Sequence, residues 1–252
     1  MTSSQEVVRL TRKGTATRDR IVAAAAELMY ERGVAGTTTE DIQQAAGGVS
    51  PSQIYHYFRD KKSLVQAVIA HQTQAILESQ EPLLTTLDSV EALEAWRDAV
   101  VATQLRRHCA GGCPIGSLAS ELADQDPQAR TELARSFLRW QDAIRGGLRA
   151  MRDKGELRAD ADPDSLALAM LTALQGGLLM TQTRRDTVAL ETVLDAMIDR
   201  IRQDATLRTR APKAQQPQDI PTRLKQWEAT ARAADLGICL DRHRVSSTAD
   251  HR

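Results

Sequence analysis

Apolar side chains recur at helical spacing along almost the whole chain, and the second and third repeats are short. Residues 17–33 carry one apolar stripe and end at a glycine, which suits a helix C-cap. Residues 37–46 begin with threonines that can cap a helix and with acids that favour its first turn. After two glycines, a serine and a proline suit the cap and first position of a third helix over residues 51–57. Two short helices joined by a glycine-containing turn indicate a helix-turn-helix.

Longer helical repeats follow this unit along most of the remaining chain. We expect helices over five further segments: residues 61–79, 89–108, 126–157, 162–186 and 189–203. The fourth of these is apolar on nearly every side, so its helix needs more than one surface to bury it. The pattern therefore predicts an all-α fold, with an N-terminal three-helix domain that holds the helix-turn-helix and a larger helical domain after it.

Charge and composition divide the chain into four parts. We expect a basic flexible arm over residues 1–16, the helix-turn-helix domain over 17–62, the larger helical domain over 63–204, and a polar tail over 205–252 with room for one extra helix. The first twenty residues hold five basic and two acidic side chains, so the arm could lie along phosphates or in a minor groove. A solubilising tail is the alternative for its first residues.

The third short helix carries the residue types that a DNA-reading helix needs. Its polar positions are Ser50, Ser52, Gln53 and His56. Such side chains can hydrogen-bond to base edges in a major groove. Tyr55 and Tyr57 hold hydroxyls on long rigid rings that can reach phosphates, and Lys61 opens the next helix near the DNA backbone. Ile54 and Phe58, four residues apart, are expected to face the core.

The last two long helices can supply half of a four-helix bundle between two copies of the chain. The expected contact residues are Leu174, Gly177, Leu178, Leu190, Val193, Leu194, Met197, Ile198 and Ile201. Gly176 and Gly177 would allow close approach of the helices, and packing within one chain is the alternative. A symmetric pair of heads would read a palindrome in double-stranded DNA more tightly than one head can.

Overall composition narrows the setting and the class of function. The chain has 252 residues, with 33 basic and 33 acidic side chains, and it lacks both a run of about 18 apolar residues and a signal-peptide pattern. We therefore expect a cytoplasmic protein that does not enter a membrane. An odd number of cysteines, three, fits reduced thiols better than a disulfide framework.

One segment suggests other chemistry. His108, Cys109 and Cys113 lie close together, so a metal-sensing or redox-sensing site, or a thiol enzyme, must be considered. A soft-metal site normally offers three or four ligands, and no further cluster lies nearby, so we expect no metal and no cofactor. The chain also lacks a phosphate-cradling glycine loop, a nucleophile elbow and a zinc-protease helix, so we expect no enzyme. An adaptor that binds protein would leave the tyrosine-rich helix unexplained.

Residues 17 to about 70 resemble the DNA-binding domain of the TetR family of bacterial transcriptional regulators. The resemblance rests on "TRDRIVAAAAELMYERG" and on "GTTTEDIQQAAGGVSPSQIYHYFRDKKSLVQAV". It implies that the third helix reads an operator and that a threonine at the start of the second helix meets phosphate. The implied DNA contacts are Thr38, Thr39, Ser50, Pro51, Ser52, Gln53, Tyr55, His56, Tyr57 and Lys61. The family usually has one glycine in the turn, whereas Gly47 and Gly48 both stand here.

The loop "HCAGGCPIGSLASEL" (residues 108–122) and the "RRD" that follows the "QGGLLM" helix resemble the C-terminal domain of the LmrA/YxaF-like branch of the same family, and the resemblance covers about residues 80–203. This resemblance implies a ligand cavity among the central helices and a repressor that is released by a small hydrophobic effector. Candidate lining residues are Trp96, Leu105, Phe137, Trp140, Met151 and Met180. Each of these is also a common core residue. Together with this resemblance, the sequence predicts a homodimeric, ligand-responsive DNA-binding regulator. Residues 17–62 would be its DNA-binding domain, and residues 63–204 would be its regulatory and dimerisation domain.

Overall fold

Helices make up all the regular structure in the part of the chain that can be described. The structure, a computed structural model, describes residues 10–205. Those residues form nine α-helices and one short 3₁₀ helix, with no strand among them, which confirms the predicted all-α class. The first nine residues of the expected arm, the candidate tail helix and Cys239 lie outside the described residues.

The N-terminal helix starts earlier than expected. α1 (Arg12–Arg32) is capped by Thr11, whose hydroxyl accepts a hydrogen bond from the backbone N–H of Gly14 at 3.2 Å. Residues 12–16, which we expected in a flexible arm, are therefore helical, because a capping threonine begins a helix without help from apolar periodicity. The end of the helix agrees with expectation, since Gly33 follows it with a φ of 76°.

Two short helices complete the N-terminal unit, which we call the head (residues 12–57). α2 (Thr39–Ala45) and α3 (Pro51–Tyr57) are joined by a turn in which Gly47 and Gly48 have φ angles of 82° and 76°. The N–H of Gly48 donates to the carbonyl of Gln43 at 2.9 Å, and the N–H of Gly47 donates to the next carbonyl at 3.1 Å. This pair of bonds is a Schellman helix end, which glycine allows at little cost. The additional glycine is thus absorbed by the end of α2.

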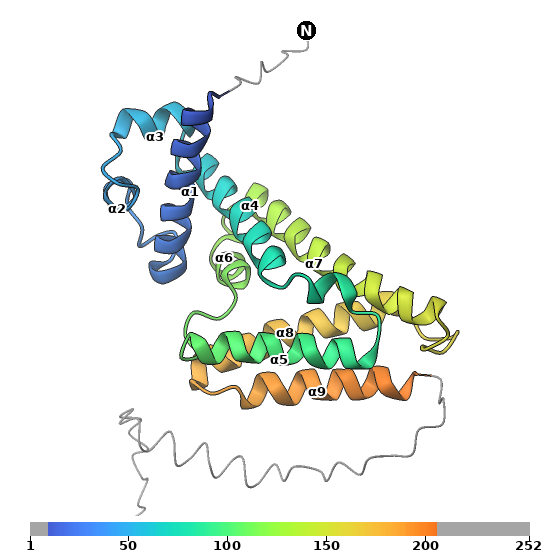
Figure 1. Ribbon diagram of the computed structural model, residues 1–252. Coiled ribbons are helices and arrows are strands. Elements are labelled where there is room, and N and C mark those ends of the chain that lie inside the picture. The colour runs from blue at the N-terminus through green and yellow to red at the C-terminus, as the bar shows by residue number, and fades with distance from the viewer. Residues whose placement is uncertain (1–9, 206–252) are drawn as a thin grey trace, which may run out of the picture. The chain divides into compact units, whose positions relative to one another are not determined.

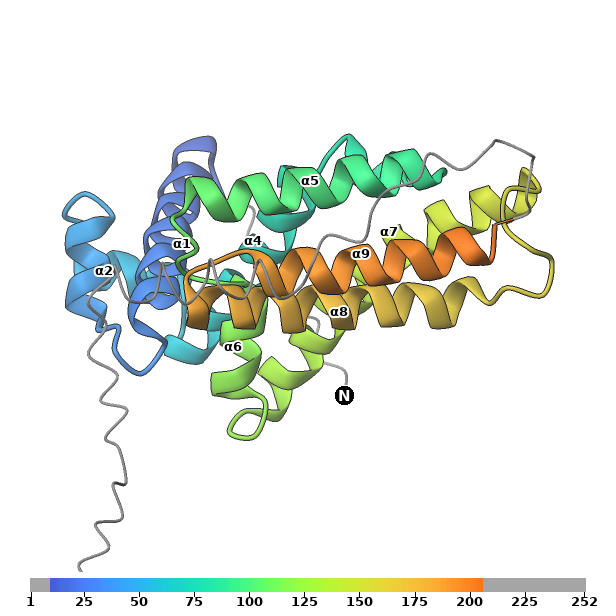
Figure 2. The same cartoon turned by 90° about the horizontal axis from the view of Figure 1, so that it is seen from below.

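The remaining helices form what we call the body (residues 61–203). Their bounds are α4 (Lys61–Ser79), the 3₁₀ helix η1 (Leu83–Thr86), α5 (Val90–Arg106), α6 (Pro114–Leu122), α7 (Pro127–Asp153), α8 (Pro163–Arg184) and α9 (Val188–Gln203). Figures 1 and 2 both show α5, α8 and α9 running alongside one another. α4 and α7 pack together beside this group, and α4 also packs against α1. α4 therefore joins the head to the rest of the body.

Hydrogen bonds fix α4 on both sides. The Thr73 hydroxyl donates to the Ser136 hydroxyl of α7 at 2.7 Å, and both side chains are buried. On the other side, Gln72 Nε2 donates to the carbonyl of Ala26 in α1 at 3.3 Å. Because buried polar groups are costly without partners, the Thr73–Ser136 pair specifies how α4 and α7 pack.

α6 occupies a segment that the sequence left without a helix. Pro114 stands at its first position, and the sulfur of Cys113 accepts a hydrogen bond from the N–H of Gly116 at 3.4 Å. Its apolar residues Ile115 and Leu118 are buried. A proline at the first helical position and this spacing of apolar residues are helix signals. They were obscured by the unusual cysteine and glycine pattern before them.

The apolar faces of α8 and α9 meet each other, which corrects the expected dimer contacts. Seven of the nine expected residues are buried within their own chain: Leu174, Gly177, Leu178, Leu190, Leu194, Ile198 and Ile201. A Cβ on Gly177 would lie 2.8 Å from Leu190 Cδ1, so this glycine allows close approach inside the protomer. Val193 and Met197 are half-buried. Since α8 is apolar on nearly every side, its sequence could not show which face turns inward.

A second apolar face of α8 points outward. Leu168, Leu179 and Met180 are 53%, 63% and 43% exposed. Gly176 also lies on this face and has no atom within 4 Å of a Cβ built on it. By length and composition alone α8 could cross a membrane, with a mean hydropathy of 1.2 in its most apolar window. In this fold it packs instead against α7 and α9.

Candidate nucleic-acid interface and ligand pocket

α3 has a buried apolar inner face and an outer face of exposed polar side chains. Ile54 and Phe58 are each 3% exposed and fix the helix in the head core, as expected. On the opposite face Tyr55 is 58% exposed, and Ser52 and His56 are exposed beside it. This arrangement leaves hydroxyl and imidazole groups free to meet a partner.

Gln53 takes part in a capping box at the start of α3. Its Oε1 accepts a hydrogen bond from the N–H of Ser50 at 2.8 Å, while the Ser50 hydroxyl accepts from the N–H of Gln53 at 3.2 Å. The hydroxyls of Ser50 and Ser52 lie 2.9 Å apart. Pro51, at the first position of the helix, is exposed. In this state Gln53 stabilises the helix end, so reading a base would require its amide to turn outward.

Two aromatic contacts orient the remaining side chains of the head. The ring of His56 meets the ring of Tyr57 edge-on, with centroids 4.9 Å apart. Tyr57 is half-buried, and its hydroxyl lies 3.6 Å from a Cβ built on Gly14 of α1. The Arg18 guanidinium lies 5.3 Å from the centre of the Phe58 ring. Tyr57 therefore packs against the head more than Tyr55 does.

The two threonines expected to contact phosphate, Thr38 and Thr39, stand at the start of α2. Thr38 caps the helix, and its hydroxyl donates to Asp41 Oδ2 at 2.7 Å. This hydrogen bond and the one from the Thr38 N–H lower the pKa of the Asp41 carboxyl. Thr39 is the first residue of the helix and is partly exposed. Of the two threonines, only Thr38 has its hydroxyl committed to a carboxylate.

Lys61 is engaged within the protein, which changes the role expected for it. Its ammonium donates to the carbonyls of Val34 and Thr37, each at 2.7 Å. Both carbonyls belong to the loop between α1 and α2. Although the residue is exposed, two of the three ammonium hydrogens stabilise this loop. Lys61 thus positions α2, and at most one hydrogen remains for a phosphate.

The same loop is held from the body by a residue that sequence reasoning missed. Glu121, near the end of α6, accepts hydrogen bonds from the N–H of Val34 at 2.8 Å and of Ala35 at 2.7 Å. The two partners lie more than 80 residues before it in the chain. No local spacing could have indicated this contact, because it exists only once α6 packs beside the head.

A cavity of about 540 Å³ lies in the body between α4, α5, α7 and α8. Trp96 and Trp140 line it, as expected. The other four expected residues do not: Met151 is fully buried in the core, Phe137 is half-buried, and Leu105 and Met180 are 57% and 43% exposed. Leu174 and Leu178, which we expected at a dimer interface, line the cavity instead. Helical periodicity identified apolar residues but could not say which surface each faces.

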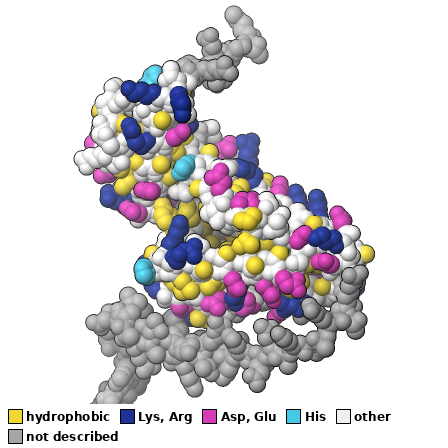
Figure 3. Space-filling view, in the orientation of Figure 1, with side chains coloured by type: hydrophobic (Ala, Val, Ile, Leu, Met, Phe, Trp, Pro, Cys, Tyr) yellow, Lys and Arg dark blue, Asp and Glu magenta, His cyan; other side chains and the backbone are white. Residues whose placement is uncertain are grey.

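The walls of this cavity are not uniformly apolar. Trp96 Nε1 donates to Gln80 Oε1 at 2.7 Å. Among the described residues, Gln104 Oε1 and Trp140 Nε1 are buried without a hydrogen-bond partner. Arg106 and Arg107 also line the cavity, at the C-terminal end of α5. Figure 3 shows Lys and Arg side chains gathered at that end of α5, next to apolar side chains. The cavity can therefore contact both apolar and charged groups.

The cavity borders directly on the head. Gly112, Cys113 and Pro114, which precede or begin α6, contribute to its lining. The Tyr30 hydroxyl of α1 donates to the carbonyl of Gly112 at 3.4 Å, and the Arg107 guanidinium lies 6.0 Å from the centre of the Tyr30 ring. Burial raises the pKa of Tyr30, so its hydroxyl is protonated and can donate. The wall of the cavity and the end of α1 are thus in contact.

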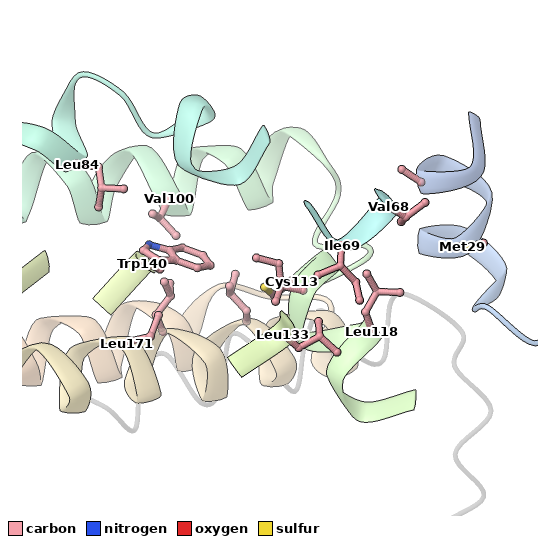
Figure 4. Close-up of a cluster of buried hydrophobic side chains, with 14 of the residues drawn as sticks. Met29, Val68, Ile69, Leu84, Val100, Cys113, Leu118, Leu133, Trp140 and Leu171 are labelled. Carbon is pink, nitrogen blue, oxygen red and sulfur yellow. The ribbon is translucent and has the colours of Figure 1, made fainter. Parts of the chain in front are cut away.

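Apolar packing also links the two regions. Figure 4 shows Met29 and Val68 at the head, with Ile69, Leu118 and Leu133 beside them. The same cluster continues past Cys113 to Trp140 and Leu171. A closely packed interior transmits displacement because it contains few voids. A change of shape at the cavity can therefore reach α1 and α4.

The two cysteines of this segment do not have the surroundings of reactive thiols. Burial raises the pKa of both Cys109 and Cys113, whereas a thiol that reacts or binds metal readily has a lowered pKa. Across residues 10–205 no group of three or more His, Cys, Asp or Glu side chains could hold a metal ion. Cys113 instead caps α6. The metal-sensing and redox-sensing alternatives gain no support from this geometry.

Comparison with known proteins agrees with both halves of the molecule. Residues 21–68 match the family model described as bacterial regulatory proteins of the tetR family, and residues 89–197 match a tetracyclin repressor-like C-terminal domain. The transcriptional repressor DhaR of Mycobacterium sp. strain GP1 is 26% identical over 73% of this chain and 92% of its own. An uncharacterized regulator of Lactococcus lactis is 30% identical over 72% of this chain and 91% of its own.

Solved structures give the same result. A TetR transcriptional regulator from Chloroflexus aurantiacus superimposes with a TM-score of 0.68 at 29% identity, covering 78% of this chain and all of that one. The resemblance to the branch that includes YxaF is supported as well, since YxaF of Bacillus subtilis is among the relatives. With a helix-turn-helix in the head, a cavity in the body and both family models matched, this chain belongs to the TetR family of DNA-binding transcriptional regulators, which are not enzymes.

Proposed function

We propose that the protein binds a palindromic operator as a homodimer and represses transcription until a small, largely hydrophobic effector enters the body cavity. The observation that carries the DNA-binding part is the outer face of α3, where Ser52, Tyr55 and His56 are exposed above a buried anchor. A helix of this length, about 10 Å, fits the major groove of B-DNA. We place the protein in the cytoplasm, because that compartment contains the bacterial DNA that it would bind.

Within this proposal the groove-facing residues divide by role. Ser52 and His56 would meet base edges, and Tyr55 would reach a phosphate with its hydroxyl. Gln53 would contribute to base reading only after leaving its capping box. Ser50, Pro51, Thr38 and Tyr57 would mainly shape and position the two helices, with Thr39 near the DNA backbone.

The dimer proposal rests on the outward face of α8. Leu168, Leu179 and Met180 are exposed there, about three helical turns apart from first to last. Large exposed apolar surfaces are rare on monomeric proteins and mark interaction sites. A second copy that packs its own α8 and α9 against this face would cover it. Val193 and Met197, half-buried on α9, remain candidates for the edge of that interface.

Repression and release follow from the contacts between cavity and head. The relative DhaR is named a repressor, which favours the same role here. An effector changes affinity for DNA only if it binds two conformations unequally. Occupation of the cavity would favour a conformation in which the two copies of α3 no longer fit successive grooves.

A selection experiment tests the proposal. Purified protein is mixed with fragments of its own genome, and the bound fragments are sequenced. We expect enrichment of one palindromic site, with binding that weakens steeply as salt rises. The double variant Tyr55→Ala/His56→Ala should lose the enrichment, whereas Leu138→Ala, an exposed change on α7, should keep it. Absence of any preferred site at every salt concentration would refute the proposal.

A further inference from the structure

We infer that the body cavity accepts small molecules that combine an apolar ring system with a carboxylate. The inference rests on the proposed role of this cavity as the effector site and adds the chemical class of the effector. It follows from the uneven distribution of side chains over the walls of the cavity.

One part of the cavity offers an apolar surface. Trp96 and Trp140 contribute indole rings, and Leu174 and Leu178 contribute side chains from α8. All four residues are less than 5% exposed, so their positions are fixed by the surrounding core. Rigid aromatic and branched walls of this kind favour flat apolar groups, because such groups bury much surface without losing conformational freedom.

The other part of the cavity offers positive charge. Arg106 donates one hydrogen bond to the Thr103 hydroxyl at 2.8 Å, and Arg107 lies over the Tyr30 ring. Neither guanidinium has a carboxylate partner within residues 10–205. The described lining contains one acid, Glu81, and one of its oxygens accepts from the Thr85 hydroxyl at 2.7 Å. Two cations against one anion leave this end of the cavity positive.

Elsewhere on the same helix the chain pairs arginine with acids. Arg97 of α5 donates to Asp195 of α9 at 2.6 Å and to Asp98 at 2.7 Å. By contrast, Arg106 and Arg107 contact only a threonine hydroxyl and the Tyr30 side chain among the described residues, so neither charge is neutralised by a carboxylate there. A carboxylate is the group that matches the planar, forked donors of a guanidinium best.

The position of Arg107 also connects this ligand class to the head. Arg107 contributes to the lining of the cavity, and its guanidinium lies 6.0 Å from the centre of the Tyr30 ring of α1. A ligand carboxylate that draws the guanidinium into the cavity would compete with its contact to Tyr30. Binding of an anionic ligand would therefore loosen one of the contacts that orient α1.

A matched pair of probes tests the charge requirement. Binding of 2-naphthoate and of 2-naphthamide, which have nearly the same shape but differ in charge, is measured by calorimetry on the full chain. We expect 2-naphthoate to bind about tenfold more tightly, as a partly exposed, charge-assisted hydrogen bond supplies. Its advantage should shrink as ionic strength rises, while the amide should respond little.

Variants then locate the charge. Arg106→Gln and Arg107→Gln should each remove most of the preference for 2-naphthoate and leave 2-naphthamide binding unchanged. Arg130→Gln is the matched control, because Arg130 is exposed on α7, bonds only to a carbonyl and lies outside the cavity lining. It should keep the full preference. These residues are exposed, so the variants are expected to fold.

Three outcomes would overturn the inference: equal or tighter binding of the amide, no binding of either probe, or an equal loss in Arg130→Gln. The salt dependence of the wild-type protein tests the same charge requirement without any variant. Operator selection by the same preparation is scored separately. A protein that selects its operator but ignores the charge of the probe refutes the ligand class, whereas one that selects no DNA refutes the proposed function.

Discussion

Glu121 makes two short hydrogen bonds across the boundary between the body and the head. Its carboxylate accepts from the N–H groups of Val34 and Ala35, while the Lys61 ammonium donates to the carbonyls of Val34 and Thr37. The loop between α1 and α2 is therefore held from two directions, by α6 and by α4. Because loop backbone groups lack the partners that a helix supplies, these two side chains fix the loop that leads into α2.

Replacement of Glu121 by glutamine tests this positioning role. The amide keeps one oxygen but turns an NH₂ group toward a backbone N–H, so one hydrogen bond is lost and the other loses its charge. We expect the free energy of unfolding in urea to fall by about 1–2 kcal/mol, as for a partly buried charged hydrogen bond. Operator affinity should fall as well, because α2 would be held less firmly against α3.

The control is Glu132→Gln on α7. Glu132 is also half-buried, but its side chain pairs only with the neighbouring Arg135 on the same helix. Such pairs contribute at most about 0.5 kcal/mol. Similar losses of stability in the two variants, or unchanged operator affinity in Glu121→Gln, would show that the Glu121 contact does not position the head.

At the scale of elements, α3 is a short helix that must stay folded and also present side chains to DNA. A capping box formed by Ser50 and Gln53 stabilises its start, and Ile54 and Phe58 anchor its inner face. A helix of seven residues is too short to be stable alone, so these contacts maintain its shape. The outer face is then free to carry exposed polar side chains such as Ser52, Tyr55 and His56.

Variants at Tyr55 and Lys61 should separate the contribution to folding from the contribution to operator binding. Tyr55 is 58% exposed, so Tyr55→Phe should leave unfolding in urea unchanged and weaken operator binding by several-fold through loss of a phosphate hydrogen bond. Lys61→Met should lower both the free energy of unfolding and the affinity for the operator, because the ammonium of Lys61 stabilises the loop before α2. We expect a loss of stability of about 1 kcal/mol for this variant.

The measurement is urea unfolding together with fluorescence anisotropy on a labelled operator. A Lys61→Met protein with wild-type stability but weaker binding would return Lys61 to the role of a plain phosphate contact. If Tyr55→Phe proved less stable yet bound normally, Tyr55 would be a packing residue and the reading face of α3 would lie elsewhere.

These elements also show what the sequence could and could not predict. Capping residues and apolar spacing located α2, α3 and most of the longer helices, because those signals act over a few residues. The start of α1 was missed because Thr11 caps it where no apolar phase announces a helix, and α6 was missed because the cysteine and glycine pattern before it obscured its proline and its apolar spacing. The partners of Glu121 depend on the assembled fold, so no local pattern could indicate them.

For the whole molecule, the important ambiguity was the orientation of α8. A helix that is apolar on nearly every side can pack one face in the core of its own chain and another face on a partner. Its inner face packs on α9 with Gly177 at the closest approach, and its outer face presents Leu168, Leu179 and Met180. The sequence predicted that α8 needs more than one burying surface, but most of the residues expected at a dimer contact lie buried inside their own chain.

A charge introduced on the outer face should therefore separate self-association from folding. Leu179→Glu changes a side chain that is 63% exposed in the single chain, so the variant should unfold at the same urea concentration as the wild type when both are dilute. In a dimer the same carboxylate would be buried without a partner. We expect the dimer dissociation constant, measured by sedimentation equilibrium, to rise at least tenfold.

The matched control is Leu138→Glu, which introduces the same charge at a position on α7 that is 54% exposed. It should not change self-association, because Leu138 lies on α7, outside the proposed interface of α8 and α9. Leu179→Glu should also bind a palindromic operator with the affinity of a half-site, since two heads are no longer held together. If Leu138→Glu dissociated the protein while Leu179→Glu did not, the partner would have to sit on α7, and the two copies of α3 would be spaced by a different surface.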